Sequence, residues 1–378
     1  MKYLDELKKE DIAGKKVLLR ADFDIPRDGG KIQDTFRINA QKETVDYLVK
    51  NEALILMVAH LTKSDETFEP FIKEISEILG YPIRLISLVD FNNGNYVLSA
   101  GEILLLDNIR RDHREENNDD ELARNLSKGF DLYVNNDFAV SHRNHASVCA
   151  ITKHLPFYGG LLIKKETLNL SRAINEPAEG KILILGGAKI STKLPVINNF
   201  FNKAEKIIVG GALANNFFLQ IFGINVGSSI VDENVSVSIK SEKIILPEDI
   251  LIAEDKSGEG PIRAYPVADV KGGRFIADVG PRSVEKFADI IKVAKMVIWN
   301  GPMGYFEIEK FSHGTNVIAR AMADSPAETI IGGGDTISAV NGLGLLEKFS
   351  YVSTGGGAML QFLAGNRLPG LEALGYYE

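Results

Sequence analysis

Cationic and imidazole side chains recur in the first half of this 378-residue chain, and all but Arg37 come after a short apolar run. Guanidinium groups bind carboxylates and phosphates through two parallel hydrogen bonds. The residues concerned are Arg37, His60, Lys63, Arg110, His142 and Arg143, together with the acidic residues Asp22 and Asp24. Each of the basic groups, taken alone, would be read as a solvated surface group or an ion-pair partner. Their recurrence after several apolar runs predicts a site for a small, highly anionic substrate.

Glycine-rich segments follow the apolar runs of the second half. They comprise 186–189 (GGAK), 210–211 (GG), 300–304 (NGPMG), 332–336 (GGGDT) and 353–357 (STGGG). Glycine lets the backbone approach a ligand closely, and the N–H groups that begin a following helix bind phosphate. Tight turns alone would explain one or two such segments but hardly five. The pattern therefore predicts a phosphate-binding region.

Four side chains of the second half have types that suit a bound nucleotide. Lys189 and Lys193 lie four residues apart, before a helix that we expect Pro195 to begin, and their charges suit phosphates. Asp335 could hold a Mg²⁺ ion that bridges phosphate oxygens, or could cap a helix. Glu307 could accept hydrogen bonds from ribose hydroxyls.

The elements that would position these side chains are short apolar, β-branched runs that alternate with stretches of helical spacing. The predicted strands are 16–20, 53–57, 102–106 and 131–134 in the first half, and 181–185, 206–209, 296–299, 328–331 and 350–352 in the second. This alternation is typical of parallel sheets covered by helices, in which ligands bind beyond the carboxyl ends of the strands. We expect an α/β fold of two Rossmann-like, three-layer domains.

A helix is predicted over 161–175, after a Gly-Gly pair and before Pro177. Because it falls between the two sets of strands, we place the domain junction there. The predicted organisation is a first domain over 1–160, an interdomain helix and hinge over 161–177, and a second domain over 178–360.

Composition and missing motifs exclude several classes of protein. A formal net charge of −8 argues against a general affinity for nucleic acid or anionic membranes. One cysteine, Cys149, leaves no internal disulfide, and neither a leader peptide nor a run of membrane-spanning length is recognised, so a cytoplasmic location is expected. The P-loop, the dinucleotide-binding fingerprint and the common hydrolase motifs are also missing. An anion-binding domain and a phosphate-binding domain remain, which suggests phosphoryl transfer.

Taken together, these motifs resemble those of the phosphoglycerate kinase family, in the same order over essentially the whole chain. The matching segments are 17–26 (VLLRADFDIP), 60–61 (HL), 104–110 (LLLDNIR), 141–147 (SHRNHAS), 186–189 (GGAK), 299–304 (WNGPMG), 332–336 (GGGDT) and 352–358 (VSTGGGA). The resemblance implies reversible, Mg²⁺-dependent transfer of a phosphoryl group between ATP and the carboxylate of 3-phosphoglycerate, giving ADP and 1,3-bisphosphoglycerate. It also implies a hinge-bending monomer whose C-terminal tail, about 361–378, packs back on the first domain.

The resemblance assigns roles to individual residues of this sequence. The implied phosphoglycerate site comprises Asp22, Phe23, Asp24, Arg37, His60, Leu61, Thr62, Lys63, Arg110, His142 and Arg143. The implied nucleotide site comprises Lys189, Lys193, Gly211, Asn300, Glu307, Gly332, Gly333, Gly334, Asp335 and Thr336, with Asp335 on the metal. The catalytic set is Arg37, Lys189, Gly333 and Gly357. No general base is needed, because the attacking carboxylate is already ionised at neutral pH.

Several positions depart from the family pattern. Asp24 stands where the family has Asn, Lys63 where it has Arg, and Thr192 where it usually has Asp; the expected Phe-Gly-Thr-Ala reads Phe138-Ala-Val-Ser141. A carboxylate beside an anionic substrate costs affinity, and lysine lacks the planar fork of arginine. The changes therefore predict weaker binding of phosphoglycerate than is usual in the family.

Two other functions stay open on the sequence. The chain could be a binding or regulatory protein with impaired catalysis, because the changes cluster around one substrate. It could instead be an acyl-phosphate kinase for a different carboxylate, in which Asp24, Lys63 and Val140 alter specificity. Retention of the basic residues in both halves favours an active phosphoglycerate kinase.

Overall fold

The computed structural model describes residues 1–28, 30–270 and 273–378. The chain divides into two compact units. Unit 1 consists of Met1–Leu168 and Arg367–Glu378, and unit 2 consists of Asn169–Asn366. Within the described residues, each unit is built around a six-stranded sheet whose neighbouring strands are all parallel. The predicted α/β class with a parallel sheet in each half is confirmed.

The sheet of unit 1 is buried on both faces. Its strand order is β5 (Ile83–Ile86), β6 (Ile103–Leu106), β4 (Leu54–Val58), β1 (Lys16–Arg20), β7 (Leu132–Asn135) and β8 (Phe157–Gly159). Along β1, Val17 and Leu19 join one apolar core while Leu18 joins the other. Because both faces are covered, the inner strands β4 and β6 are continuously apolar.

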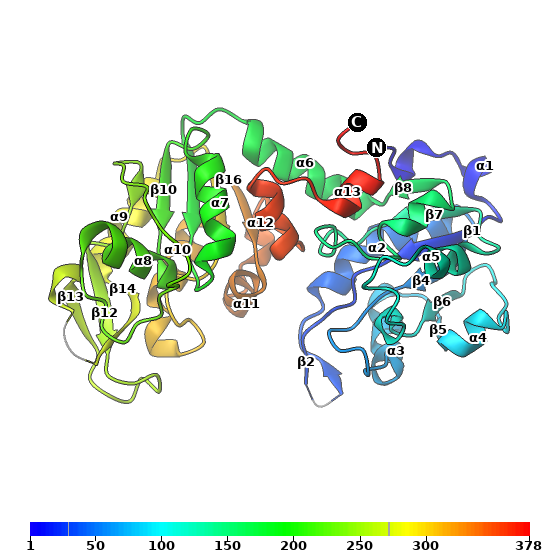
Figure 1. Ribbon diagram of the computed structural model, residues 1–378, viewed down its shortest axis with the longest axis horizontal. Coiled ribbons are helices and arrows are strands. Elements are labelled where there is room, and N and C mark those ends of the chain that lie inside the picture. Colours follow the sequence, from blue (N-terminus) through cyan, green and yellow to red (C-terminus); the bar gives the residue numbers. More distant parts are fainter. Residues whose placement is uncertain (29, 271–272) are drawn as a thin grey trace. The chain divides into compact units, whose positions relative to one another are not determined.

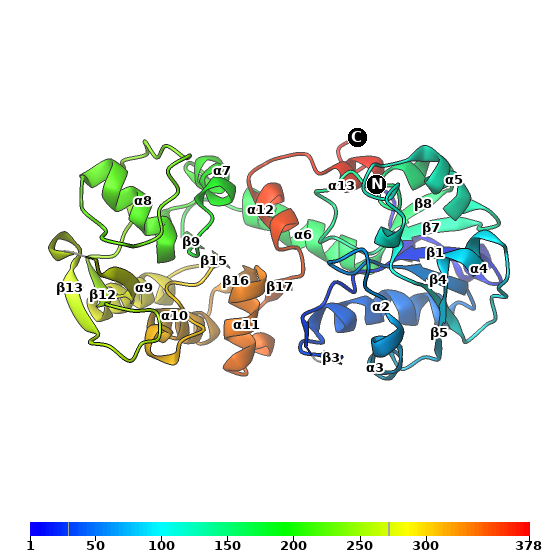
Figure 2. The ribbon, with the colours of Figure 1, turned by 60° about the horizontal axis from the view of Figure 1, so that its bottom comes forward.

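Helices cover the two faces of this sheet. Figure 2 shows α2 (Phe36–Lys50) and α3 (Ile72–Leu79) below the sheet and α5 (Asp120–Ser127) above it. The shorter elements are η1 (Leu4–Glu6), α1 (Lys9–Ile12), the β2 (Arg27–Asp28) and β3 (Lys31–Ile32) hairpin, η2 (Glu69–Phe71), α4 (Leu88–Asn92), η3 (Ile109–Arg111), η4 (Ala150–Lys153) and α13 (Pro369–Ala373). The two ends of the chain meet in this unit (Figure 1), where the N-terminal amine of Met1 donates to the Gly375 carbonyl at 2.8 Å.

Unit 2 repeats the three-layer arrangement. Its strand order is β11 (Ile244–Ile245), β10 (Lys206–Val209), β9 (Lys181–Leu185), β15 (Met296–Asn300), β16 (Glu328–Gly332) and β17 (Tyr351–Ser353). Figure 2 shows α7 (Ile190–Phe200), α8 (Gly211–Phe222) and α12 (Gly357–Leu363) above this sheet, and α9 (Pro281–Lys292), α10 (His313–Ala323) and α11 (Gly334–Gly342) below it. The fully buried Trp299 lies in the core on the α9 and α10 side.

Unit 2 also holds an antiparallel sheet that the sequence analysis did not predict. Its order is β13 (Arg263–Pro266), β12 (Asp249–Ala253) and β14 (Phe275–Val279), and Figure 1 shows these strands grouped at one side of the unit. None of the four residues of β13 is buried, and the strand ends in proline, so its composition carries no strand signal. The remaining short elements of the unit are η5 (Val267–Asp269), η6 (Glu309–Phe311) and η7 (Leu346–Lys348).

The helix predicted over 161–175 is confirmed as α6 (Leu161–Asn175), and the division between the units falls inside it. The prediction that Pro195 begins a helix is wrong, because α7 begins at Ile190 and includes Pro195. Proline in that position leaves the Ser191 carbonyl without an intrahelical N–H. Both residues are exposed, so water can satisfy that carbonyl and the helix continues.

Candidate functional site

The carboxyl ends of four strands in unit 1 lie side by side. Arg20 pairs in register with Val58 and Asn135, and Val58 pairs with Leu106. The loops that leave these strands therefore start from one edge of the sheet. They carry Asp22, Phe23 and Asp24; His60, Leu61, Thr62 and Lys63; Arg110; and His142 and Arg143. Arg37 reaches this group from the first turn of α2.

Phe23 and Leu61 face away from this edge. Both side chains are fully buried in the core, where the ring of Phe23 packs edge-to-face on that of Phe68 with centroids 6.2 Å apart. Their side chains anchor the two loops, so only their backbone is available to a ligand.

His60 is held in one tautomer by Arg20. The fully buried Arg20 directs Nη2 at His60 Nδ1, 2.9 Å away, and a guanidinium can only donate. Nδ1 is therefore the acceptor and the ring proton sits on Nε2, which lies 3.8 Å from Asp24 Oδ2. Burial, followed by the charges of Arg20 and Arg110, lowers the pKa of His60 well below its usual range. His60 is thus a neutral hydrogen-bond donor.

Arg20 itself is fixed by a buried polar network that the sequence analysis did not assign to the site. Its Nη1 lies 3.0 Å from Asp137 Oδ2, and its Nε donates to Ser147 Oγ at 3.0 Å. Ser147 Oγ in turn donates to Glu115 at 2.6 Å, and burial raises the pKa of that carboxyl group. The only sequence signal for Arg20 was a charge at the end of an apolar strand.

The two acidic residues of the first loop have different surroundings. Asp22 is fully buried, and burial raises its pKa to about 7 although Arg37, 3.4 Å from its Oδ1, acts in the opposite direction. Asp24 is partly exposed, and its Oδ1 accepts a hydrogen bond from the Thr62 hydroxyl at 2.6 Å. Arg37 Nη1 also donates to the Asp24 carbonyl at 2.8 Å. Asp24 therefore ties the first loop to the second.

Positive charge is concentrated and incompletely paired around Arg110. Its Nη1 donates to the carbonyls of Leu61 and Thr62 at 3.3 and 3.2 Å, while its buried Nη2 has no hydrogen-bond partner among the described residues. Burial and then Arg143 lower the pKa of Arg110, and the same two causes lower the pKa of His142. An anion placed here would satisfy Nη2 and relieve the mutual repulsion.

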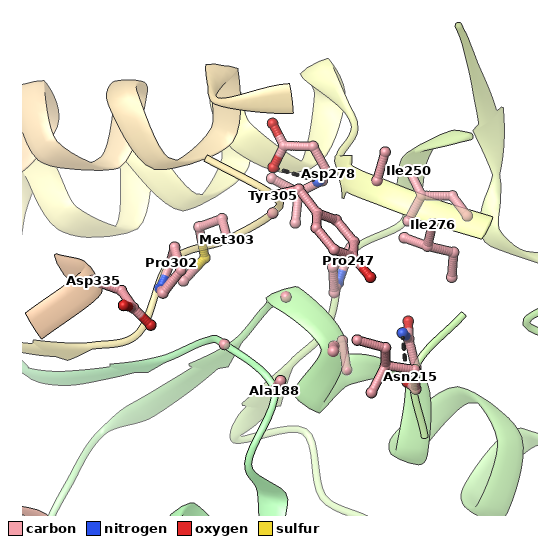
Figure 3. A pocket seen from close by; sticks show the side chains of 18 of the residues that line it. Ala188, Asn215, Pro247, Ile250, Ile276, Asp278, Pro302, Met303, Tyr305 and Asp335 are labelled. Atoms are coloured by element: carbon pink, nitrogen blue, oxygen red, sulfur yellow. Dashed lines mark hydrogen bonds between the residues drawn. The ribbon is translucent and has the colours of Figure 1, made fainter. Parts of the chain in front are cut away.

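Unit 2 contains a pocket that is apolar at one end and charged at the other. Figure 3 shows Asp335 at one end and Asn215, Ile250 and Ile276 at the other. Further lining residues are Ala188, Gly211, Phe218, Ile230, Pro247, Met303, Tyr305 and Glu307. Such a pocket suits a flat apolar ring joined to an anionic group.

The glycines of this region serve two purposes. A Cβ on Gly211 would lie 2.6 Å from Gly187 N, and one on Gly301 would lie 2.3 Å from Gly186 O, so three turns pack backbone against backbone. In contrast, a Cβ on Gly334 would meet no atom within 4 Å. Open space at Gly334 leaves its backbone accessible to a ligand. The explanation by tight turns alone thus accounts for the first group but not for Gly334.

The charged end of the pocket lies at the start of α11. Its N-cap residue, Gly333, offers no side-chain cap, so the first N–H groups of the helix are available to phosphate. The alternative of Asp335 as a helix cap is wrong, since Asp335 lies within the first turn. Gly357 similarly begins α12, after an uncapped Gly356.

Lys193 is buried near this end, whereas Lys189 is exposed. Burial lowers the pKa of Lys193 to about 8, with Asp335 raising it and Lys189 lowering it further. A buried ammonium close to pocket glycines is suited to a phosphate group, which would compensate its desolvation. Thr192 donates to the Lys189 carbonyl at 3.0 Å and thereby braces the turn before α7.

The side chains of Asn300 and Thr336 stabilise the turns beside the pocket through hydrogen bonds. Asn300 Nδ2 donates to the carbonyl of Gly332 at 2.8 Å, and Thr336 Oγ1 accepts from the N–H of Gly301 at 2.7 Å. Both side chains are buried, so they join the turns after β15 and β16. Glu307 is exposed at the rim.

Asp278 is a buried carboxylate of this pocket that the sequence analysis did not single out. It accepts hydrogen bonds from the N–H groups of Gly314 and Val279 at 2.7 and 2.8 Å, and burial raises its pKa to about 7 against these two bonds. It therefore fixes the start of α10 against β14.

The residues near Asp335 fit a magnesium ion that is held mainly by phosphate oxygens and water, with few contacts from the protein. Among the described residues, no cluster of three or more acidic, histidine or cysteine side chains could form a complete metal cage. Asp335 is exposed at the charged end of the pocket and makes no hydrogen bond or ion pair with the described chain. One carboxylate combined with phosphate oxygens and water is a usual magnesium environment.

A helix-covered parallel sheet in each unit, with a basic cluster in unit 1 and a pocket with an apolar and a charged end in unit 2, places the chain among the α/β proteins whose ligands bind beyond the carboxyl ends of the strands. The family model for phosphoglycerate kinase matches residues 7–366. The chain belongs to the phosphoglycerate kinase family, which confirms the resemblance found in the sequence and makes it a kinase of glycolysis.

Individual relatives agree with this assignment over nearly their full lengths. The chain is 39% identical to the phosphoglycerate kinase of Herpetosiphon aurantiacus, covering 96% of each chain, and 39% identical to that of Prochlorococcus marinus, covering 98% of each. The solved phosphoglycerate kinase of Pyrococcus horikoshii has a TM-score of 0.87 at 30% identity, covering 99% of this chain and 98% of its own. Among the described residues, no helix combines the length and apolar character needed to cross a membrane.

Proposed function

We propose that the chain transfers the γ-phosphoryl group of ATP to the carboxylate of 3-phosphoglycerate, reversibly, giving ADP and 1,3-bisphosphoglycerate. The observation that carries the assignment of the acceptor site is the buried Arg110, whose Nη2 lacks a partner among the described residues. A phosphate or a carboxylate is the kind of ligand that this guanidinium group binds.

The acceptor would be bound by unit 1. His60, held as a neutral donor by Arg20, and the guanidinium groups of Arg37, Arg110 and Arg143 supply donors to the two anionic ends of phosphoglycerate. Lys63 is exposed and follows Thr62, whose carbonyl accepts a hydrogen bond from Arg110. It adds a further positive charge. The attacking carboxylate is ionised at neutral pH, so the residues position it and need not remove a proton.

The nucleotide would be bound by unit 2, its ring at the apolar end and its phosphates at the start of α11. Lys189, Lys193 and the N–H groups around Gly333 and Gly334 neutralise charge that spreads over the transferring group. Glu307 at the rim suits the ribose hydroxyls. Asp335 would hold Mg²⁺, which supplies charge neutralisation between phosphates when bound.

The finer properties expected from the sequence are part of the same proposal. We place the catalytic contacts at Arg37, Lys189, Gly333 and Gly357, and expect a cytoplasmic monomer that uses no nucleic acid or membrane partner. Phosphoryl transfer requires water to be excluded, which the hinge-bending expected around α6 would accomplish.

A second candidate is an acyl-phosphate kinase for another carboxylate. Asp24, which accepts a hydrogen bond from Thr62, favours this second candidate, because its carboxylate stands where the family has an amide. A kinase assay with Mg·ATP and a panel of small phosphorylated and unphosphorylated carboxylates separates the two. We expect 3-phosphoglycerate to give the highest kcat/KM for ADP formation; a different carboxylate that exceeds it would replace the proposed substrate.

A further inference from the structure

Asn108, which lies shortly after β6, uses the whole hydrogen-bonding capacity of its side chain. The residue is fully buried. Its Oδ1 accepts from the N–H groups of Leu61 and Arg110 at 3.0 and 3.3 Å. Its Nδ2 donates to the carbonyls of Lys63 and Glu66 at 2.8 and 3.0 Å. An amide oxygen has two lone pairs and an amide nitrogen has two protons, so these four bonds occupy the entire group.

The four partners belong to the two loops that carry basic groups of the candidate acceptor site. Three of them lie within 61–66, directly after His60, and the fourth is Arg110 itself. The two loops leave β4 and β6, which are paired neighbours in the sheet. Asn108 therefore joins the backbone of one loop to the backbone of the other at the edge where the candidate site lies.

These bonds hold the loops without using a group that a ligand needs. Arg110 also holds the first loop, through Nη1 bonds to the carbonyls of Leu61 and Thr62. An anion that binds the guanidinium group competes with those carbonyls for it. The buried amide of Asn108 is out of reach of such a ligand, so its bonds persist when the site is filled.

The partners of Asn108 require an amide at this position. If its oxygen and nitrogen were exchanged, two carbonyls would face an acceptor and two N–H groups would face a donor. A carboxylate of the same shape could accept from the two N–H groups but would oppose the carbonyls of Lys63 and Glu66. Even a protonated carboxyl group could donate only one of the two bonds. Asn108→Asp thus alters the hydrogen bonding here with almost no change in volume.

We propose that Asn108 is a positioning residue of the acceptor site, which sets the loop of His60 and Lys63 relative to Arg110. This inference rests on the proposed function, because it takes 3-phosphoglycerate as the ligand that the two loops bind. Asn108 does not touch the substrate. It acts by fixing the backbone from which the binding side chains extend, and a small displacement of one loop would spoil contacts to both anionic ends of the substrate.

Titration calorimetry of the intact protein with 3-phosphoglycerate, and separately with Mg·ADP, tests the proposal. We expect Asn108→Asp to weaken phosphoglycerate binding about tenfold, because two buried carbonyls lose their donors and the loop shifts. ADP affinity should not change, since the nucleotide pocket lies in unit 2. Asn108→Ser adds no charge and should give the same result, which separates the position of the loop from an added negative charge. The serine variant also provides the measurement if the aspartate variant does not fold.

Asn136→Asp is the matched control. Asn136 is also fully buried in unit 1, and its side chain bonds to Gln41, Thr44 and the N–H of Leu162, which lie outside the two loops. We expect this variant to keep the phosphoglycerate affinity of the parent protein. Unchanged affinity in the folded Asn108 variants, or an equal loss in Asn136→Asp, would overturn the role of Asn108 and leave the proposed kinase intact. A parent protein that binds no 3-phosphoglycerate would overturn the proposed function as well.

Discussion

At the scale of single residues, the proposed acceptor site differs from the family pattern at Asp24, and the structure shows what this carboxylate contacts. The partly exposed Asp24 accepts from Thr62 and lies 3.8 Å from His60 Nε2, so its negative charge competes with the substrate for the same donor. The sequence predicted the charge conflict. It could not predict the bond to Thr62, which depends on how two loops meet at the sheet edge.

Asp24→Asn is expected to tighten binding of 3-phosphoglycerate about tenfold, because it removes one negative charge while an amide oxygen can still accept from Thr62. Titration calorimetry with each ligand separately measures the effect. ADP affinity serves as the control and should not change, since Asp24 belongs to unit 1. An unaltered phosphoglycerate affinity would refute the charge argument.

Arg37→Ala and Lys189→Ala are each expected to lower kcat by about 10²-fold or more, with smaller changes in KM, because they remove charge that acts on the transferring group. Steady-state kinetics with both substrates varied provide the measurement. Arg37→Lys is the control. It keeps the positive charge but lacks the guanidinium group that donates to the Asp24 carbonyl. A variant whose kcat stays near the parent value removes that residue from the mechanism.

Lys193 is expected to give the proposed nucleotide site a pH dependence. Its pKa is lowered to about 8, so the free protein loses this charge as the pH rises through 8, whereas bound phosphates favour the protonated form. We therefore expect ADP affinity to be constant from pH 7 to about 8 and to fall above it. Lys193→Arg keeps its charge and should give a flat profile to about pH 9.5. A parent protein with a flat profile over the same range would show that Lys193 does not contact the phosphates.

At the scale of elements, most of the parallel strands and the long helix α6 were predictable because apolar runs and glycine or proline boundaries mark them locally. The strands β5, β8 and β11, which lie at sheet edges, were not predicted. Half of the predicted strand ends differ by one residue from the observed ends; the strand predicted over 53–57 is β4, Leu54–Val58. The antiparallel sheet was not predicted: β13 has no buried residue, and β12 and β14 were missed although most of their residues are buried. The start of α7 was misplaced because proline was read as a first-turn residue, although solvent permits it within the helix.

The glycine turns of unit 2 provide a test at this scale. Gly301→Ala should destabilise unit 2 by roughly 3 kcal/mol or more, because φ at Gly301 is +94° and the new Cβ would lie 2.3 Å from the Gly186 carbonyl oxygen. Gly334→Ala should leave the melting temperature nearly unchanged and weaken ADP binding, since its Cβ points into open space at the start of α11. Thermal unfolding and ADP titration of both variants give the comparison. Equal stability losses would contradict the division of the glycines into packing and ligand-approach groups.

At the scale of the whole molecule, each unit has its own cores and its own candidate ligand site. The clustered basic residues were predictable from recurrence after strands, because parallel strands bring their carboxyl ends to one edge. The roles of Arg20, Glu115 and Asp278 were not, since each depends on contacts between residues distant in the chain. The family model matches residues 7–366, which include most of both units.

The proposed activity is transfer of a phosphoryl group from ATP to the carboxylate of 3-phosphoglycerate. The most direct test is the initial rate of ADP formation by the purified protein with Mg·ATP, in the presence and absence of saturating 3-phosphoglycerate, with hydroxylamine trapping of the acyl phosphate. We expect ADP formation to depend strongly on 3-phosphoglycerate and to yield one trapped acyl group per ADP. Binding of ATP without any phosphoglycerate-dependent turnover would contradict it.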